Sequence, residues 1–255
     1  MTNLKESILK NQLSVGSWIT LGHPAIAEMM AKAGFDWLTI DMEHSAIDLG
    51  DAQILMQVIE LSGVTPLVRV GENDSYLIKR VMDAGAKGVI VPMVNSKEEA
   101  IRAVEAVKYP PFGKRGVGLG RAQGYGLEFE KYKKWARKES IVIVQVEHID
   151  AVRNLEAILA VKGVDGFIVG PYDLSGSLGV PGEFDNRDVK SALDRVLKVS
   201  KKMKKTAGFH VVDPDPELFK KKFAEGYRFL AFGLDTLFLG KSCKERLAAI
   251  KKLRS

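Results

Sequence analysis

Eight short runs rich in β-branched and other apolar residues recur along this chain, and amphipathic stretches with helical spacing separate them. This alternation is typical of repeated strand–helix units that form a parallel sheet. We expect the strands at residues 15–21, 36–43, 65–70, 88–94, 141–147, 165–170, 206–211 and 227–234. Helix-end signals lie between them, with Gly34 placed as a C-cap and Ser96 and Glu99 spaced as a capping box. Eight units whose strands are apolar on both faces favour a closed TIM-type (β/α)8 barrel over an open doubly wound sheet.

Length and composition are consistent with one α/β domain over residues 1–255. The chain has 46% hydrophobic residues and no evident linker, which is enough for one sizeable core. Its first fifteen residues are too polar for a signal peptide, and no apolar run approaches the roughly 18 residues needed to span a membrane. The lone cysteine, Cys243, can form no internal disulfide, as suits a reducing compartment. We therefore expect a cytoplasmic protein with no membrane partner.

The net charge of +6 comes from lysines and arginines that are scattered over several predicted helices. Nucleic-acid binding would favour a continuous basic stripe with stacking aromatic residues or a recognisable module. Neither is visible in the sequence, so the basic residues are interpreted as solvated helix faces and no nucleic-acid partner is expected.

The longest interruption of the alternating pattern runs from Tyr109 to about Arg137 and contains PPFGKRGVGLGRAQGYG. We expect this segment on the active-site face, as the loop after the fourth strand and before a short helix. It would form either a lid or a simple surface loop. Its glycines do not directly follow a strand or open a βαβ helix, which disfavours a dinucleotide-binding fingerprint.

Polar residues gather at the predicted carboxyl ends of the strands, where barrels of this type build their active sites. They are Asp41, Glu43 and His44 after strand two, Arg69 in strand three, Gln145 and Glu147 at strand five, Gly170 to Asp173 after strand six, and His210 in strand seven.

Glu147 and Asp173 are expected on two adjacent strands. Carboxylate oxygens that converge from a rigid scaffold are suitable ligands for a hard divalent cation, with water or substrate completing the coordination. Either residue alone could be a helix cap or part of a surface ion pair. Gln145 points to the same side as Glu147 by the period of two in a strand, which favours the metal site.

Arg69 lies within an apolar run, where its charge needs a partner. It would stabilise an enolate or carboxylate oxygen, or pair structurally with Asp41 or Glu43, and both roles can coexist. His44 directly follows the acidic pair and is the candidate for proton transfer. Asp83 would orient His44 provided that its helix end reaches the mouth of the barrel.

Two absences bear on the chemistry. None of the predicted strand ends carries a lysine, which disfavours an imine-forming aldolase and favours a metal enolate. The loop VVDPDPE after strand seven lacks the glycines of the usual barrel phosphate site, which disfavours a phosphorylated sugar.

The chain contains the motifs IDMEHS, VPMVNSKEEA, PPFGKRGVG, VQVE, AGFHV and above all GVDGFIVGPYDLS. These motifs resemble the HpcH/HpaI family, the class II, metal-dependent pyruvate aldolases of the 2,4-dihydroxyhept-2-ene-1,7-dioate and 2-keto-3-deoxy-sugar-acid type, and the resemblance covers essentially the whole chain. It implies a barrel that exchanges its C-terminal helix within a homo-hexamer built as a dimer of trimers. It also implies a site that holds Mg²⁺, Mn²⁺ or Co²⁺.

The resemblance also implies roles for single residues. Glu147 and Asp173 match the metal ligands, Arg69 the enolate-stabilising arginine, and His44 the acid–base histidine. Asp83 matches the carboxylate that supports this histidine, and Asp41 the acid just before the histidine motif. The positions that line the pyruvate pocket are matched by Trp18, Gln145, Gly170 and Pro171.

His210 departs from the family pattern, because aldolases that act on aliphatic hydroxy-aldehydes commonly have an apolar residue after strand seven. It is either a substrate contact or a hydrogen-bonded wall residue, which leaves the identity of the aldehyde open.

The sequence therefore predicts a carbon–carbon lyase that cleaves or forms 4-hydroxy-2-keto acids through a pyruvate enolate and an aldehyde. One alternative is a citrate-synthase-like enzyme or a CoA-linked lyase of the same superfamily. The other is a non-catalytic barrel that binds a 2-keto acid.

Overall fold

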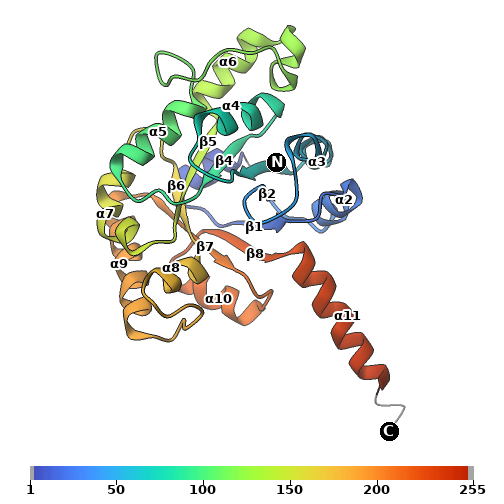
Figure 1. The fold of residues 1–255 in the computed structure, drawn as a ribbon, viewed down its shortest axis with the longest axis vertical. Coiled ribbons are helices and arrows are strands. Elements are labelled where there is room, and N and C mark those ends of the chain that lie inside the picture. The colour runs from blue at the N-terminus through green and yellow to red at the C-terminus, as the bar shows by residue number, and fades with distance from the viewer. Residues whose placement is uncertain (1–2, 252–255) are drawn as a thin grey trace.

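A computed structural model describes residues 3–251 of the chain. Eight parallel strands close into one barrel in which each strand pairs with its sequence neighbours and β8 pairs with β1 (Figure 1). The strands are β1 Ser14–Ile19, β2 Trp37–Asp41, β3 Thr65–Arg69, β4 Gly88–Val91, β5 Ile141–Val146, β6 Gly166–Val169, β7 Thr206–Val211 and β8 Phe229–Leu234. The predicted single TIM-type α/β barrel and all eight predicted strand regions are confirmed.

Most of the helices surround this barrel (Figure 1). The helices of the described chain are α1 Leu4–Leu9, α2 Pro24–Lys32, α3 Leu49–Leu61, α4 Ser75–Ala84, α5 Lys97–Val107, the 3-10 helix η1 Arg121–Gly126, α6 Phe129–Lys138, α7 Ile149–Leu159, α8 Pro171–Ser177, α9 Arg187–Met203, α10 Pro216–Glu225 and α11 Asp235–Lys251. The predicted capping box of Ser96 and Glu99 forms in both directions at the start of α5. Gly34 follows the C-cap of α2 and adopts a φ of 99°, which an L-residue rarely tolerates.

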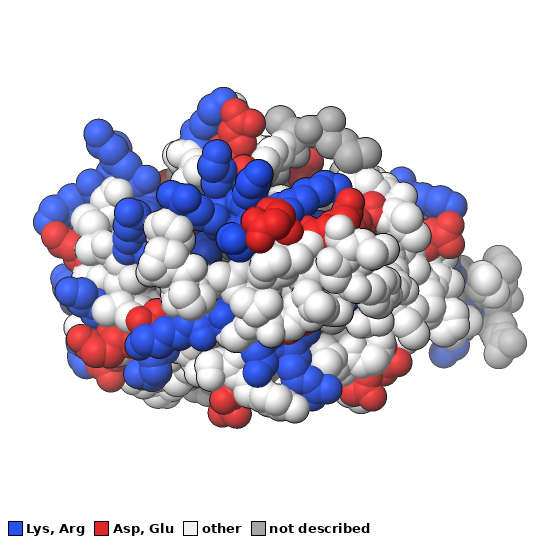
Figure 2. All heavy atoms as spheres, turned by 90° about the horizontal axis from the view of Figure 1, so that it is seen from above, with Lys and Arg blue, Asp and Glu red and all other residues white. Residues whose placement is uncertain are grey.

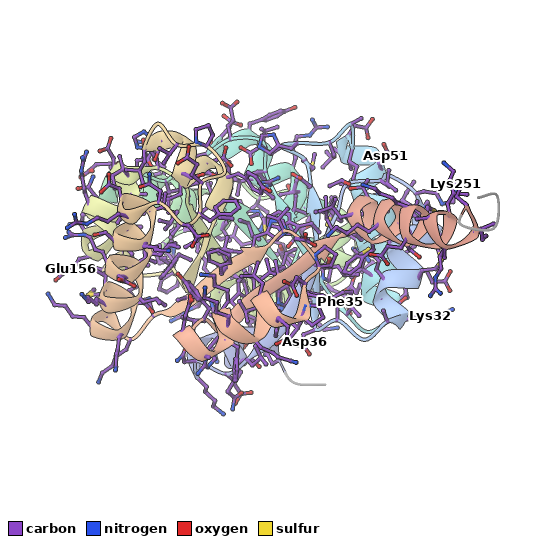
Figure 3. The ribbon with its side chains drawn as sticks, turned by 90° about the horizontal axis from the view of Figure 1, so that it is seen from below. Lys32, Phe35, Asp36, Asp51, Glu156 and Lys251 are labelled. Atoms are coloured by element: carbon purple, nitrogen blue, oxygen red, sulfur yellow. The ribbon has the colours of Figure 1, made fainter. Side chains whose placement is uncertain are left out.

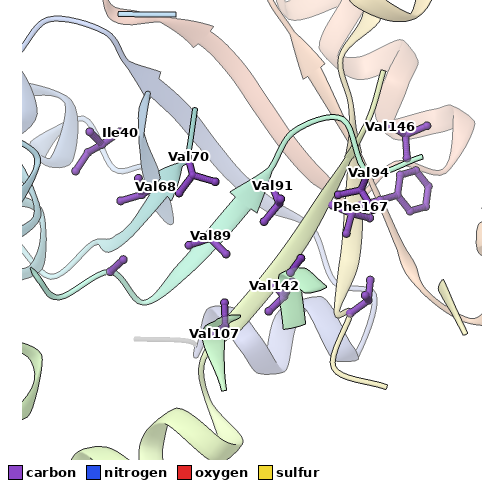
Figure 4. Close-up of a cluster of buried hydrophobic side chains, with 14 of the residues drawn as sticks. Ile40, Val68, Val70, Val89, Val91, Val94, Val107, Val142, Val146 and Phe167 are labelled. Carbon is purple, nitrogen blue, oxygen red and sulfur yellow. The ribbon is translucent and has the colours of Figure 1, made fainter. Parts of the chain in front are cut away.

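The main hydrophobic core lies between the strands and the surrounding helices. Figure 4 shows Val68, Val89 and Val142 on three consecutive strands, together with Val107 of α5 in the same cluster. Because side chains alternate along a strand, these outward positions alternate with positions that face the barrel interior.

The barrel interior changes character along its axis. In β5, the interior positions Ile141 and Ile143 are apolar, and they are followed by Gln145 and then Glu147. The apolar layers are buried together in a second cluster, which α1 covers at the N-terminal end with Leu4 and Ile8. Polar side chains are thereby left at the C-terminal end of the barrel, which is the end predicted for the chemistry.

The predicted position of the 109–137 segment is wrong. Since α5 intervenes between β4 and this segment, residues 108–140 connect α5 to β5, and their first part, residues 108–128, lies at the N-terminal end of the barrel before α6. Arg121 of this segment bonds to Glu60 and to the carbonyl of Ala84, at the C-terminal ends of α3 and α4. The segment therefore cannot serve as a lid over the active site of its own chain.

The last helix, α11, extends away from the barrel (Figure 1), and Lys251 at its end lies at the edge of the molecule (Figure 3). Asp235 is its one buried residue, whereas Leu239, Leu247 and Ile250 are exposed. None of the helices within residues 3–251 is long and apolar enough to cross a membrane. On the face drawn in Figure 2, basic side chains form separate patches that acidic and uncharged surface interrupts.

Candidate active site

A cavity of about 190 Å³ opens at the C-terminal end of the barrel. Most of the residues predicted for the site line it. The lining comprises Trp18, His44, Arg69, Gln145, Ile168, Val169, Gly170, Pro171, Tyr172, Asp173, His210 and Val212. These residues come from five strands and from the loops and helix that follow them, so the barrel itself brings the site together.

Arg69 forms the charged centre of one wall. Asp41 and Arg69 occupy partner positions in β2 and β3, and the guanidinium Nε and NH2 donate to the two Asp41 carboxylate oxygens at 2.9 and 2.6 Å. NH1 lies 3.1 Å from Glu43 Oε2, and the guanidinium carbon lies 4.5 Å from the centre of the Trp18 ring. The structural pairing predicted for Arg69 therefore exists, while Arg69 also lines the cavity.

Asp41 is nearly buried and acts through its neighbours. Burial by itself would raise its pKa, but hydrogen bonds and the charge of Arg69 outweigh this effect and hold the pKa below its ordinary value. Its Oδ1 also accepts the backbone N–H groups of Glu43 and His44. One ionised carboxylate thus orients the arginine fork and the loop that carries His44.

Glu147 is 3% exposed, and both of its carboxylate oxygens have partners. Oε1 accepts the backbone N–H of Met93 at 2.6 Å, and Oε2 accepts from the side-chain amide of Gln145. Met93 adopts a left-handed φ of 51°, a conformation that its residue type does not signal in the sequence. Burial raises the pKa of Glu147, and the negative charge of Asp173 raises it further.

Asp173 lies in the first turn of α8 and is exposed to solvent. Asp173 lines the cavity, and its charge acts on the pKa of Glu147, which is buried beside Gln145 of the lining. Gly170 lets the chain pass close to Gln145 and Glu147, because a Cβ there would lie 3.3 Å from each of them.

Glu43 is a site residue that the sequence reasoning treated only as a partner for Arg69. Burial raises its pKa to about 7 against the lowering effect of Arg69, and the charges of Glu147, Asp41 and Asp173 add to the increase. Its position directly before His44 was the available signal in the sequence.

The donor set fits a hard divalent cation. Within residues 3–251, no group of three or more His, Cys, Asp or Glu side chains forms a closed metal cage. The oxygens present are carboxylate and amide oxygens; among the described residues, Gln145 Oε1 is buried without a hydrogen-bond partner, and the buried Glu43 Oε2 has only its ion pair with Arg69. A cation beside Glu147 and Asp173 would offset the mutual repulsion of these acids and leave coordination positions for substrate and water.

His44 lies in the loop after β2, with 63% of its side chain exposed at the mouth of the cavity. Its Nε2 is 3.9 Å from Glu43 Oε2. The imidazole is thus accessible to a substrate and close to the acidic wall.

The predicted support of His44 by Asp83 does not occur within the chain. Helix α4 runs back along the barrel, so Asp83, in its last turn, lies at the N-terminal end and away from the cavity. There its Oδ1 accepts from the guanidinium of Arg115 and from the side-chain amide of Gln123. The helix end on which this prediction depended does not reach the mouth of the barrel.

His210 and Trp18 form another part of the cavity wall, with their ring centres 5.1 Å apart. His210 Nε2 lies 3.2 Å from the carbonyl oxygen of Gly233 in β8. Burial lowers the pKa of His210 to about 3.

Comparison with known proteins places this geometry in a family. Residues 14–241 match the sequence model of the HpcH/HpaI aldolase/citrate lyase family. The chain is 38% identical over 249 residues to a 2-keto-3-deoxy-L-rhamnonate aldolase of Klebsiella pneumoniae, covering 97% of this chain and 92% of that protein.

Solved structures agree with this assignment. An HpcH/HpaI aldolase/citrate lyase family protein from Burkholderia cenocepacia is 34% identical with a TM-score of 0.92, and the match covers 100% of both chains. The citrate synthase SbnG is 26% identical with a TM-score of 0.87 over 98% of both chains. The predicted resemblance and the predicted class of carbon–carbon lyase are confirmed. This chain belongs to the HpcH/HpaI aldolase/citrate lyase family.

Proposed function

We propose that this protein cleaves 4-hydroxy-2-keto acids to pyruvate and an aldehyde, and catalyses the reverse condensation, with a divalent cation in the site. The observation that carries the proposal is the convergence of Arg69, Asp173 and an accessible histidine on one cavity of about 190 Å³, with the buried Glu147 hydrogen-bonded to Gln145 of its lining. Family membership supplies the reaction class, and the named Klebsiella relative makes 2-keto-3-deoxy-L-rhamnonate the first substrate to test.

Glu147 and Asp173 would hold Mg²⁺, Mn²⁺ or Co²⁺. When bound there, the cation supplies a Lewis acid that polarises the keto group of the substrate. Gln145 donates to Glu147 and Met93 N–H fixes its other oxygen, so the carboxylate is held in one orientation. Gly170 and Pro171 start α8 and place Asp173 in its first turn.

Arg69 stabilises the negative charge that develops on the keto oxygen as the carbon–carbon bond breaks. Its planar fork is held from behind by Asp41 and rests on the face of Trp18. A group fixed in this way need not reorganise when the charge appears, which is the basis of electrostatic catalysis.

His44 handles the proton. In the cleavage direction, its imidazole accepts the proton of the C4 hydroxyl while the C3–C4 bond breaks, giving the aldehyde and the enolate of pyruvate. This proton is then returned to the methylene carbon of the enolate, which gives pyruvate and leaves His44 neutral again. The exposure of His44 at the cavity mouth gives the hydroxyl direct access to the ring.

The projecting helix α11 supports the expected assembly. We infer a homo-hexamer, arranged as a dimer of trimers, in which α11 packs on a neighbouring barrel and covers its exposed leucine and isoleucine side chains. Because Asp83 lies at the far end of its own barrel, any support that it gives to His44 has to cross between two copies of the chain.

Pyruvate release from 2-keto-3-deoxy-L-rhamnonate and related 4-hydroxy-2-keto acids tests the proposal. A chelator should abolish release, and added Mn²⁺ or Co²⁺ should restore it. Glu147→Gln and Asp173→Asn should lose both activity and metal affinity in isothermal titration, because each removes one charged ligand. Glu183→Gln, an identical change at an exposed position outside the cavity, should keep both.

Two results would contradict the proposal. Full activity in metal-stripped protein would remove the role of the cation. Citrate formation from oxaloacetate and acetyl-CoA, without pyruvate release from any hydroxy-keto acid, would instead favour the synthase reaction named for SbnG.

A further inference from the structure

A row of three side chains leads from the charged end of the cavity to His210. The guanidinium carbon of Arg69 lies 4.5 Å from the Trp18 ring centre, and the Trp18 ring centre lies 5.1 Å from that of His210. These distances place Trp18 between Arg69 and His210 in the cavity wall. We expect a 2-keto acid held at Arg69 to extend along Trp18 toward His210 as its chain lengthens, so that His210 would face the carbons that leave as the aldehyde.

The hydrogen bond to Gly233 determines the tautomer of His210. A backbone carbonyl oxygen can only accept, so the ring nitrogen 3.2 Å away, Nε2, carries the proton. In a neutral imidazole the other nitrogen is then an acceptor. Nδ1 has no hydrogen-bond partner among residues 3–251, and the ring lines the cavity.

The ring remains neutral under ordinary conditions. Burial, together with the positive charge of Arg69 nearby, lowers the pKa of His210 far below the neutral range. His210 is thus unsuited to move protons, unlike the exposed His44. It presents a fixed acceptor where a leucine or valine would present only a methyl group.

We propose that His210 Nδ1 accepts a hydrogen bond from a hydroxyl on the carbon next to the aldehyde carbonyl, so that the enzyme selects hydroxy-aldehydes over plain aliphatic aldehydes. This inference rests on the proposed aldolase function and assigns the residue that recognises the hydroxyl of its aldehyde partner. A partner without the hydroxyl would displace water from Nδ1 of the half-buried His210 without giving it a donor, and an acceptor that loses its hydrogen bond in this way costs free energy.

The experiment compares 2-hydroxypropanal, in both enantiomers, with propanal as acceptors for pyruvate, because the two molecules differ by one hydroxyl. The wild-type enzyme should have the higher kcat/KM with one enantiomer of 2-hydroxypropanal. In His210→Leu the kcat/KM for the preferred enantiomer of 2-hydroxypropanal, divided by that for propanal, should fall about tenfold, which is the scale of one unsatisfied hydrogen bond. His210→Asn should keep most of the preference, because its Oδ1 takes the place of Nδ1.

A matched control is His23→Leu, since His23 caps α2 through its own Nδ1 and lies outside the cavity. This variant should keep the wild-type ratio. Proton exchange at the methyl group of pyruvate in D₂O is measured alongside, because exchange reports enolate formation without any aldehyde.

The outcomes separate the two hypotheses. Two results would overturn the role of His210, provided that proton exchange still occurs. They are equal kcat/KM values of the wild-type enzyme for propanal and 2-hydroxypropanal, and an unchanged ratio of these two values in His210→Leu. Absence of exchange in the wild-type enzyme loaded with Mn²⁺ would overturn the aldolase function, and with it this assignment.

Discussion

The pairing of Arg69 with Asp41 illustrates what one buried charge requires. A guanidinium inside an apolar strand has to be neutralised, and the parallel register places Asp41 directly beside it on β2. The sequence left open whether Arg69 serves structure or catalysis. In the structure, Asp41 pairs with Nε and NH2 of Arg69 while Arg69 also lines the cavity, so the structural pairing leaves room for the proposed catalytic role.

Separate side chains are assigned to proton transfer and metal binding, and His44→Ala tests this separation. We expect the variant to retain metal and pyruvate binding, because Glu147, Asp173 and Arg69 are untouched. It should lose roughly 10²–10⁴ of the rate, the usual scale for a positioned acid–base group. Isothermal titration of metal and pyruvate, beside kcat for cleavage, measures both quantities.

His23→Ala provides the control for that measurement, since His23 is exposed and lies outside the cavity. It should behave like the wild-type enzyme in both assays. Parallel loss of metal affinity and activity in His44→Ala would reject the proton-transfer role and make His44 a metal ligand.

At the scale of elements, the side chain of Trp37 in β2 packs directly on the backbone of β1. Gly16 is the partner position of Trp37 in β2, and a Cβ on Gly16 would lie 2.0 Å from the Trp37 ring. Trp37 cannot move aside, because it is fully buried and stacks on Phe229 with ring centres 4.2 Å apart. Glycine at position 16 is therefore a packing requirement of the barrel interior.

Gly16→Ala should lower the free energy of unfolding by on the order of 3 kcal/mol, the upper range for overpacking a core. Urea denaturation followed by circular dichroism measures the change. Gly176→Ala in α8 is the matched control, because a Cβ added there would meet nothing within 4 Å beyond its own helix, and alanine favours helix. Equal stability of the Gly16 and Gly176 variants would show that the interior repacks around the added methyl group.

The position of residues 108–128, which was predicted wrongly, shows that the preceding element determines the end of the barrel at which a loop lies. Glycines and prolines indicate a loop wherever they occur, but only the intervening α5 determines at which end of the barrel that loop lies. The same reversal of direction along α4 carries Asp83 away from His44.

For the whole molecule, α11 is the feature that a single chain does not explain. Its exposed Leu239 and Leu247 are left in solvent by the one chain described, whereas a neighbouring barrel would bury them. We expect the wild-type protein to sediment as a hexamer. A Leu239→Glu, Leu247→Glu double variant should give smaller species, because charges would then be buried at the interface.

Leu61→Glu introduces the same change at the end of α3, where the side chain is 87% exposed, and should leave the sedimentation coefficient unchanged. A monomeric wild-type protein, or a hexamer that tolerates both charges in α11, would contradict the proposed exchange of this helix.

The sequence by itself determined the barrel, its eight strands, the capping box of α5 and the strand ends that carry the site, because these depend on periodicity and on residues close in the chain. It did not determine the contacts of Glu43, the backbone conformation that aims Met93 N–H at Glu147, or the tautomer of His210. Nor did it place Asp83 and the 108–128 segment at the correct end of the barrel. Only the tertiary structure decided these, because they depend on the register between strands and on the direction in which each connecting helix returns.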